Sequence, residues 1–68
     1  MNTEEIKRAF SLGTPIIYQD IEYECISAII YRKAEPTGIK IQIELKDKSA
    51  HSVTIAESSR AEIKGAGL

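Results

Sequence analysis

The segment IEYECISAIIYRK, residues 21–33, changes its pattern of apolar and polar side chains halfway along its length. Its first five residues alternate apolar and acidic side chains, as expected for a strand with one buried face. From Ile26 onward, apolar residues occupy both sets of alternating positions. A strand that changes its buried face in this way must bend, carry a bulge, or be covered on both sides. We place the bend at the small residues Ser27 and Ala28.

The sequence on either side of this segment also has the pattern of short strands joined by turns. Residues 14–20, TPIIYQD, predict a first strand that ends in a tight turn at Gln19 and Asp20. Residues 34–38, AEPTG, predict a second turn with Pro36 at its corner, because proline has the φ angle that this position needs. The segment between the two turns is therefore expected to form a long second strand.

The most regular strand pattern lies in residues 39–46, where apolar and polar residues alternate strictly. We expect one face of this third strand to lie in the core, with the side chains of Ile39, Ile41, Ile43 and Leu45. Val53 and Ile55 are expected to point inward from a fourth strand. Residues 56–60, AESSR, predict a short turn or one turn of 3₁₀ helix, and residues 61–64, AEIK, predict a last short strand.

The N-terminal residues have the pattern of a short amphipathic helix. Asn2 or Thr3 can cap its first turn, and Gly13 can end it. One apolar stripe is formed by Ile6, Ala9 and Phe10. A helix over residues 2–12 is too short to be stable alone, so we expect it to dock on the strands.

These elements predict a mainly β fold in a single domain, residues 1–68. No second helix is available to connect parallel strands, so the sheet is expected to be antiparallel. Short strands in so small a chain enclose a core best by curling, and we expect a small five-stranded barrel over residues 14–64. Residues 65–68 are expected to be a frayed tail.

The order of a short helix, a strand with a tight turn, a long bent strand and a regular third strand resembles the SH3-like barrels, especially their Sm-like branch. The similarity is carried by PIIYQDIEYECISAI, residues 15–29, and the layout extends over residues 3–64. Sm-like proteins usually have glycine where this chain has Asp20 and again near Ser27, and YRKAEPTG lacks the aspartate of their RNA-binding loop. The resemblance therefore implies the barrel more than RNA binding or ring assembly. The chain also resembles small bacterial or prophage proteins.

Composition excludes several classes of partner and compartment. The formal net charge is -1, so the overall field does not attract nucleic acid or anionic membranes. The single cysteine cannot form an internal disulfide, and the N-terminus has acidic residues where a secretory signal would be basic. No apolar run approaches the roughly 20 residues that span a bilayer. We expect a cytoplasmic protein that does not bind membranes.

The residues that could carry out chemistry do not form a recognisable catalytic pattern. Cys25 and His51 are the only thiol and the only imidazole, and a nucleophilic pair would also need a third group to orient the base. Cys25 is predicted to be a small buried residue and His51 to lie exposed beside a turn. Glu22 and Glu24 share a face that is predicted to be solvated. With no phosphate loop or metal motif, we expect a non-enzyme without cofactor or metal.

The surface residues that could bind a partner are Tyr31, Arg32 and Lys33, with Tyr18 and Lys40 expected nearby. An aromatic ring among cations can stack on a base and hold a phosphate, or can anchor a protein partner. Alternatively, Tyr31 covers the core and the cations are simply solvated.

Two functions remain open on these grounds. The first is a small protein-interaction or assembly module that binds a protein partner or itself through a sheet edge or the loop end of the barrel. The second is binding of single-stranded RNA or DNA, which the slightly acidic balance of the chain disfavours.

Overall fold

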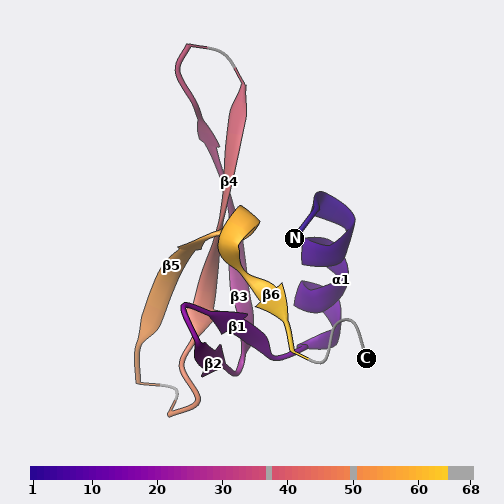
Figure 1. The fold of residues 1–68 in the computed structure, drawn as a ribbon, viewed down its shortest axis with the longest axis vertical. Coiled ribbons are helices and arrows are strands. Elements are labelled where there is room, and N and C mark those ends of the chain that lie inside the picture. The colour runs from indigo at the N-terminus through magenta and orange to yellow at the C-terminus, as the bar shows by residue number, and fades with distance from the viewer. Residues whose placement is uncertain (37, 50, 65–68) are drawn as a thin grey trace.

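The computed structural model describes residues 1–36, 38–49 and 51–64, and the expected tail at residues 65–68 lies outside this range. The described residues form a mainly β fold with one N-terminal helix, which confirms the predicted class (Figure 1). In chain order the elements are α1 (Thr3–Leu12), β1 (Ile16–Tyr18), β2 (Ile21–Tyr23), β3 (Cys25–Lys33), β4 (Ile39–Lys46), β5 (Val53–Glu57), the 3₁₀ helix η1 (Ser58–Arg60) and β6 (Glu62–Ile63).

The strands pair in two antiparallel sheets, with the orders β2-β1-β6 and β3-β4-β5. β2 continues into β3 through Glu24 alone, whose backbone amide donates to the carbonyl of Lys46 at 2.9 Å. Residues 21–33 therefore supply one strand to each sheet. The register of β3 on β4 shifts between Ile26 and Ala28, which confirms an irregularity where the small residues predicted one.

The two sheets are joined at one side by the bent segment and at the other by η1, which links β5 to β6. No closed ring of paired strands is found among the residues that the structure describes, because β5 and β6 do not pair with each other there. The antiparallel sheets are thus observed, and the SH3-like barrel stays a prediction.

The tight turn between β1 and β2 is confirmed at Gln19 and Asp20, with φ angles of 51° and 63°. Two consecutive residues with positive φ are what a two-residue hairpin loop needs to match the twist of its strands. Tyr18 and Ile21 are cross-strand partners on either side of it. The turn predicted from AEPTG includes position 37, which lies outside the described residues.

α1 begins and ends as its sequence predicts. The side chain of Asn2 accepts a hydrogen bond from the amide of Glu5 at 2.8 Å, and the Glu5 carboxylate accepts one from the amide of Asn2 at 2.9 Å. Gly13 ends the helix with a φ of 68°. The helix packs on β3 and buries Ile6, whereas Phe10, which was expected in the apolar stripe, lies exposed at its rim.

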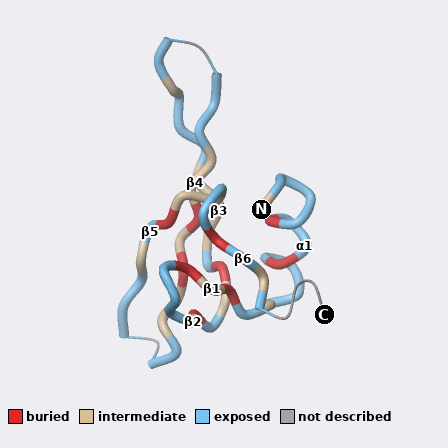
Figure 2. Tube along the Cα trace, in the orientation of Figure 1, coloured by how far each residue is buried: buried red, intermediate tan, exposed pale blue. Residues whose placement is uncertain are grey.

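The core lies where α1 and the two sheets meet (Figure 2). Its residues come from α1, from each of the strands β1 to β5, and from the position before β6. They are Ile6, Ala9, Ile16, Tyr18, Tyr23, Ile26, Ile43, Leu45, Ala56 and Ala61.

The inward face of β5 is the opposite of the one predicted. Val53 and Ile55 are 53% and 45% exposed, whereas Ala56 is 1% exposed. The reason is the register, since Ala56 pairs with the buried Ile43 and cross-strand partners lie on the same face of a sheet. The position of the neighbouring strand outweighs the greater hydrophobicity of valine and isoleucine.

Burial decreases along β4 toward its N-terminal end. Leu45 and Ile43 are fully buried, Ile41 is half-buried, and Ile39 is 69% exposed, so Ile39 is not part of the core as was expected. The cause is the length of the third strand of this sheet, because β5 pairs with β4 only from Gln42 onward. The rest of the β3–β4 hairpin projects beyond the body of the molecule as a two-stranded ribbon (Figure 1). The described residues of this part, 31–36 and 38–41, are called the arm below.

Candidate binding surface

The arm has two different faces, which follow from its cross-strand pairs. Tyr31 pairs with Ile41, and Lys33 pairs with Ile39. By strand alternation these residues share a face with the buried Ile43. We call this the inner face of the arm. The cross-strand pairs that alternate with these point to the opposite, outer face, which is exposed to solvent.

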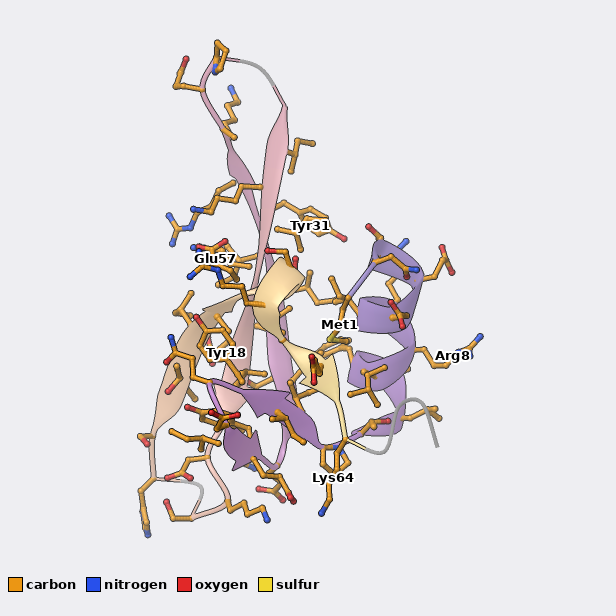
Figure 3. All side chains as sticks on the ribbon, viewed as in Figure 1. Met1, Arg8, Tyr18, Tyr31, Glu57 and Lys64 are labelled. Atoms are coloured by element: carbon orange, nitrogen blue, oxygen red, sulfur yellow. The ribbon has the colours of Figure 1, made fainter. Side chains whose placement is uncertain are left out.

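The inner face carries a row of apolar side chains that continues out of the core. Ile29 and Ile41 pack against the core and are half-buried, whereas Tyr31 is 56% exposed and Ile39 is more exposed still. We call these four residues the inner strip. Figure 3 shows Tyr31 pointing from the arm toward the side on which α1 lies. The inner strip is therefore apolar surface on a projecting element that nothing else in the described chain covers at its outer end.

The outer face carries a ladder of polar contacts instead. Arg32 donates from Nε to Oε1 of Gln42 at 2.6 Å, and Gln42 donates from Nε2 to Oε1 of Glu57 at 3.0 Å. Lys40 Nζ lies 3.1 Å from the same Glu57 oxygen. The hydrogen bond from Gln42 and the neighbouring Lys40 lower the pKa of Glu57 below its ordinary value. These contacts hold the side chains of Arg32 and Lys40 against the sheet.

The five residues that the sequence singled out for binding lie in three places. Tyr18 is buried in β1, in the other sheet. Tyr31 and Lys33 lie on the inner face of the arm, and Arg32 and Lys40 lie on the outer face. The structure therefore separates the aromatic ring from two of the cations that were expected around it.

Ile39 belongs to the surface although it was assigned to the core from the sequence, and Ile41, assigned in the same way, packs against the core but is only half-buried. The signal that could have revealed them is a difference in length. The alternating pattern of residues 39–46 is eight residues long, and the following strand spans only five. A strand of five residues cannot cover a strand of eight, so one end of the alternating row had to remain open.

In the part of the chain that the structure describes, no hydrogen bond joins any two of the residues considered for catalysis, Cys25, His51, Glu22 and Glu24. His51 donates from its backbone amide to Ser49 Oγ at 3.4 Å, and no hydrogen bond joins it to Cys25 among the residues described. Glu22 Oε2 lies 2.6 Å from Lys48 Nζ, and Glu22 Oε1 lies 2.8 Å from Lys64 Nζ. Hydrogen bonds from these two lysines lower the pKa of Glu22, the opposite of what a general acid needs.

A small hollow lies beside the β1–β2 turn, lined by Ile17, Gln19, Asp20, Arg60 and Glu62. Its volume is about 140 Å³. Typical ligand pockets begin at roughly 300 Å³ and are mostly apolar. This hollow is therefore too small and too polar to indicate a bound cofactor or substrate.

The described ranges also lack a metal-binding cluster and a membrane-spanning helix. These ranges contain no group of three or more histidine, cysteine, aspartate or glutamate side chains placed to hold a metal ion. None of their helices has the length and hydropathy to cross a membrane.

Comparison with protein-family models, with curated proteins and with solved structures finds no match for this chain. The described residues present three surfaces, which are the inner strip, the polar outer face of the arm, and the hollow beside the β1–β2 turn. Among them, the inner strip stands out because it combines exposure, apolar character and projection from the body.

Proposed function

We propose that the protein is a small non-catalytic protein-interaction or assembly module, and that its contact surface is the inner strip. The observation that carries this proposal is the exposure of Tyr31 and Ile39 on an arm that extends beyond the third strand of its sheet. Contiguous apolar surface on a soluble domain is typical of a site that a partner covers.

The chemistry of the inner strip suits a protein partner. Full burial of one large apolar side chain contributes roughly 1.5–3 kcal/mol, and tyrosine is enriched among residues that dominate binding energy. Lys33 lies next to the strip and supplies the charged rim that such interfaces have. Because the two strands of the arm are already paired, the arm loses less conformational entropy on binding than an unstructured segment would.

The unpaired strand edges of the arm support the same proposal. β3 is the last strand of its sheet, and β4 has no partner on its other side between Ile39 and Ile41 in the part of the chain that the structure describes. Unpaired edges can accept a strand from another chain. A partner could thus engage the apolar face and an edge of the arm together.

We also propose that the two sheets are the halves of the SH3-like barrel expected from the sequence. The support is the order of the strands, which runs β6-β1-β2 and then β3-β4-β5 through one bent segment. In this arrangement α1 packs at one side and leaves the arm free.

Binding of single-stranded RNA or DNA is the second candidate. It is favoured by one observation, the excess of cations on the arm, where Arg32, Lys33 and Lys40 outnumber the single carboxylate of Glu35. It ranks second because Arg32 and Lys40 already hold polar partners on the face opposite Tyr31.

The proposal is tested by placing a photoreactive amino acid at position 39 and, as a matched control, at position 55 on β5. Both are exposed isoleucines. We expect crosslinking to a protein at position 39 only. The captured protein is then purified, and its affinity is measured for the wild type, Ile39→Asp and Ile55→Asp. We expect Ile39→Asp to weaken binding about tenfold or more. Equal affinities for all three proteins would contradict the proposal.

A further inference from the structure

We infer that the occupant of the inner strip is a second copy of this chain, bound with the two arms antiparallel about a two-fold axis. This inference rests on the proposed function, because it names the partner of the same surface. It is carried by the distribution of charge between the arm and the body, together with the position of the helix.

The arm and the body have opposite net charges. Residues 31–41 contain three of the nine cations and one of the ten carboxylates, which gives the arm a formal charge of +2. The rest of the chain then has a formal charge of −3, for a total of -1. The arm of one copy is therefore attracted to the body of another.

The charges that could meet across such an interface are free of ion pairs within one copy. Arg32 lies on the outer face and donates to Gln42, whereas Lys33, the cation on the inner face of the arm, forms no ion pair with a carboxylate among the described residues. The same holds for Glu4 and Glu5 in the first turn of α1. Each copy thus offers Lys33 on the inner face of its arm and carboxylates at the start of its helix.

The start of α1 lies on the inner side of the arm. The amino group of Met1 donates to the carbonyl of Ser58 at 3.0 Å, which fixes this end of the chain against η1. Figure 3 shows Met1 below Tyr31 on the same side of the arm. The inner strip therefore has Lys33 toward the tip of the arm, and the acidic first turn of α1 lies on the same side of the arm.

An antiparallel arrangement matches these positions. When two inner strips face each other with opposite directions, the apolar pair of Tyr31 and Ile41 lies near the axis and Lys33 of each copy approaches Glu4 of the other. A parallel arrangement would instead bring Lys33 against Lys33. The surface is thus complementary to itself, which is the property of an isologous two-fold interface. A different protein would need to supply an apolar strip together with a carboxylate opposite Lys33 and a cation opposite Glu4.

Association is measured by analytical ultracentrifugation of the full chain, over micromolar to near-millimolar concentrations. We expect a monomer–dimer equilibrium that Ile39→Asp weakens about tenfold or more. Ile55→Asp is the matched control and is expected to leave the equilibrium unchanged. Circular dichroism of each variant checks that it is folded. If Ile39→Asp does not fold, Ile39→Ser is the milder substitution that replaces it in the measurement.

A charge exchange tests the antiparallel geometry. We expect Lys33→Glu and Glu4→Lys each to weaken the dimer several-fold, and the double variant to recover most of the loss. A zero-length crosslink between Lys33 and Glu4 is then sought in a mixture of isotopically light and heavy protein. Crosslinked peptides that combine light and heavy chains are expected. The geometry would be overturned if every crosslinked peptide pair carried a single isotope label, because such crosslinks form within one chain. It would also be overturned if the double variant dimerised more weakly than both single variants.

The outcomes separate this inference from the proposed function. A wild type that stays monomeric at the highest concentration overturns the second copy as partner. If position 39 then captures a different protein that Ile39→Asp no longer binds, the proposed function stands without the dimer. If the monomer instead binds labelled single-stranded RNA or DNA, and Arg32→Ala with Lys33→Ala abolishes this at low salt, both proposals are wrong. A dimer that Ile39→Asp leaves intact also overturns the inference.

Discussion

Single side chains at the ends of α1 account for its position and length. Asn2 and Glu5 exchange hydrogen bonds in a capping box, which satisfies two backbone amides that the first turn leaves without a partner. Gly13 has the left-handed conformation that ends a helix at low energetic cost. The sequence left Asn2 and Thr3 as alternative caps, and the structure assigns the cap to Asn2.

Replacing Asn2 by alanine is expected to lower the free energy of unfolding by about 1 kcal/mol, within the range measured for caps of this type. The loss arises because the amide of Glu5 then has no side-chain acceptor. Thr3→Ala removes a neighbouring exposed side chain and is the control, with an expected change below about 0.5 kcal/mol. Urea unfolding followed by circular dichroism measures both. Equal losses in the two variants would contradict the assignment of the cap.

The strands illustrate what local pattern can and cannot predict. Residues 39–46 were predicted to form a strand because their alternation of apolar and polar residues is a property of the segment itself. The irregularity at Ser27 was predicted because the set of alternating positions that is apolar changes there. The prediction of the inward face of β5 was wrong, because that face depends on which residue of β4 lies opposite each residue of β5. The exposure of Ile39 was missed for a related reason, since it depends on where a neighbouring strand ends.

The same limit applies to the candidate surface. Tyr31, Arg32 and Lys33 are adjacent in the sequence and were grouped for that reason. Adjacent residues of a strand point to opposite faces, so this group divides once a strand is formed. The apolar partner of Tyr31 is Ile41, which is ten positions away and reaches it only through the hairpin register. Predicting the inner strip therefore needed the register of β3 on β4 and the length of β5.

The orientation of β5 gives a direct test of register. Ala56→Asp places a carboxylate in the core beside Ile43, so we expect the free energy of unfolding to fall by at least about 2 kcal/mol. Ile55→Asp changes an exposed side chain of the same strand and is expected to cost below about 1 kcal/mol. Chemical denaturation of the two variants under identical conditions is the measurement. If Ile55→Asp lowered the free energy of unfolding more than Ala56→Asp, the result would support the inward face that the sequence alone predicts, with Ile55 in the core.

Across the whole fold, a few ion pairs connect segments that are distant in the sequence. Glu22 of β2 contacts Lys48, in the turn after β4, and Lys64, just after β6. One carboxylate thus links the two sheets at the end opposite the arm. Glu57 similarly joins β5 to β4 through Gln42 and Lys40. Such long-range contacts cannot be predicted from local pattern, because any of ten carboxylates could meet any of nine cations.

These contacts predict how stability depends on pH. Hydrogen bonds from Lys48 and Lys64 lower the pKa of Glu22 in the folded protein, and the hydrogen bond from Gln42, followed by Lys40, lowers that of Glu57. A carboxylate whose pKa is lower when folded contributes stability above its unfolded pKa, about 4.3 for glutamate. This contribution is lost as the pH falls through the folded pKa. We therefore expect the free energy of unfolding to decrease from pH 5 toward about pH 3.

Glu22→Gln removes one of these titrating groups and both of its ion pairs. We expect this variant to be less stable than the wild type at pH 7 and to lose less stability between about pH 5 and pH 3. Glu24→Gln is the matched control, because Glu24 is exposed and forms no ion pair within the described ranges. Urea unfolding at several pH values gives the slope for each protein. If Glu22→Gln kept the wild-type slope, the ion pairs of Glu22 would contribute nothing to the loss of stability in acid. Screening these ion pairs with salt would then also leave the free energy of unfolding unchanged.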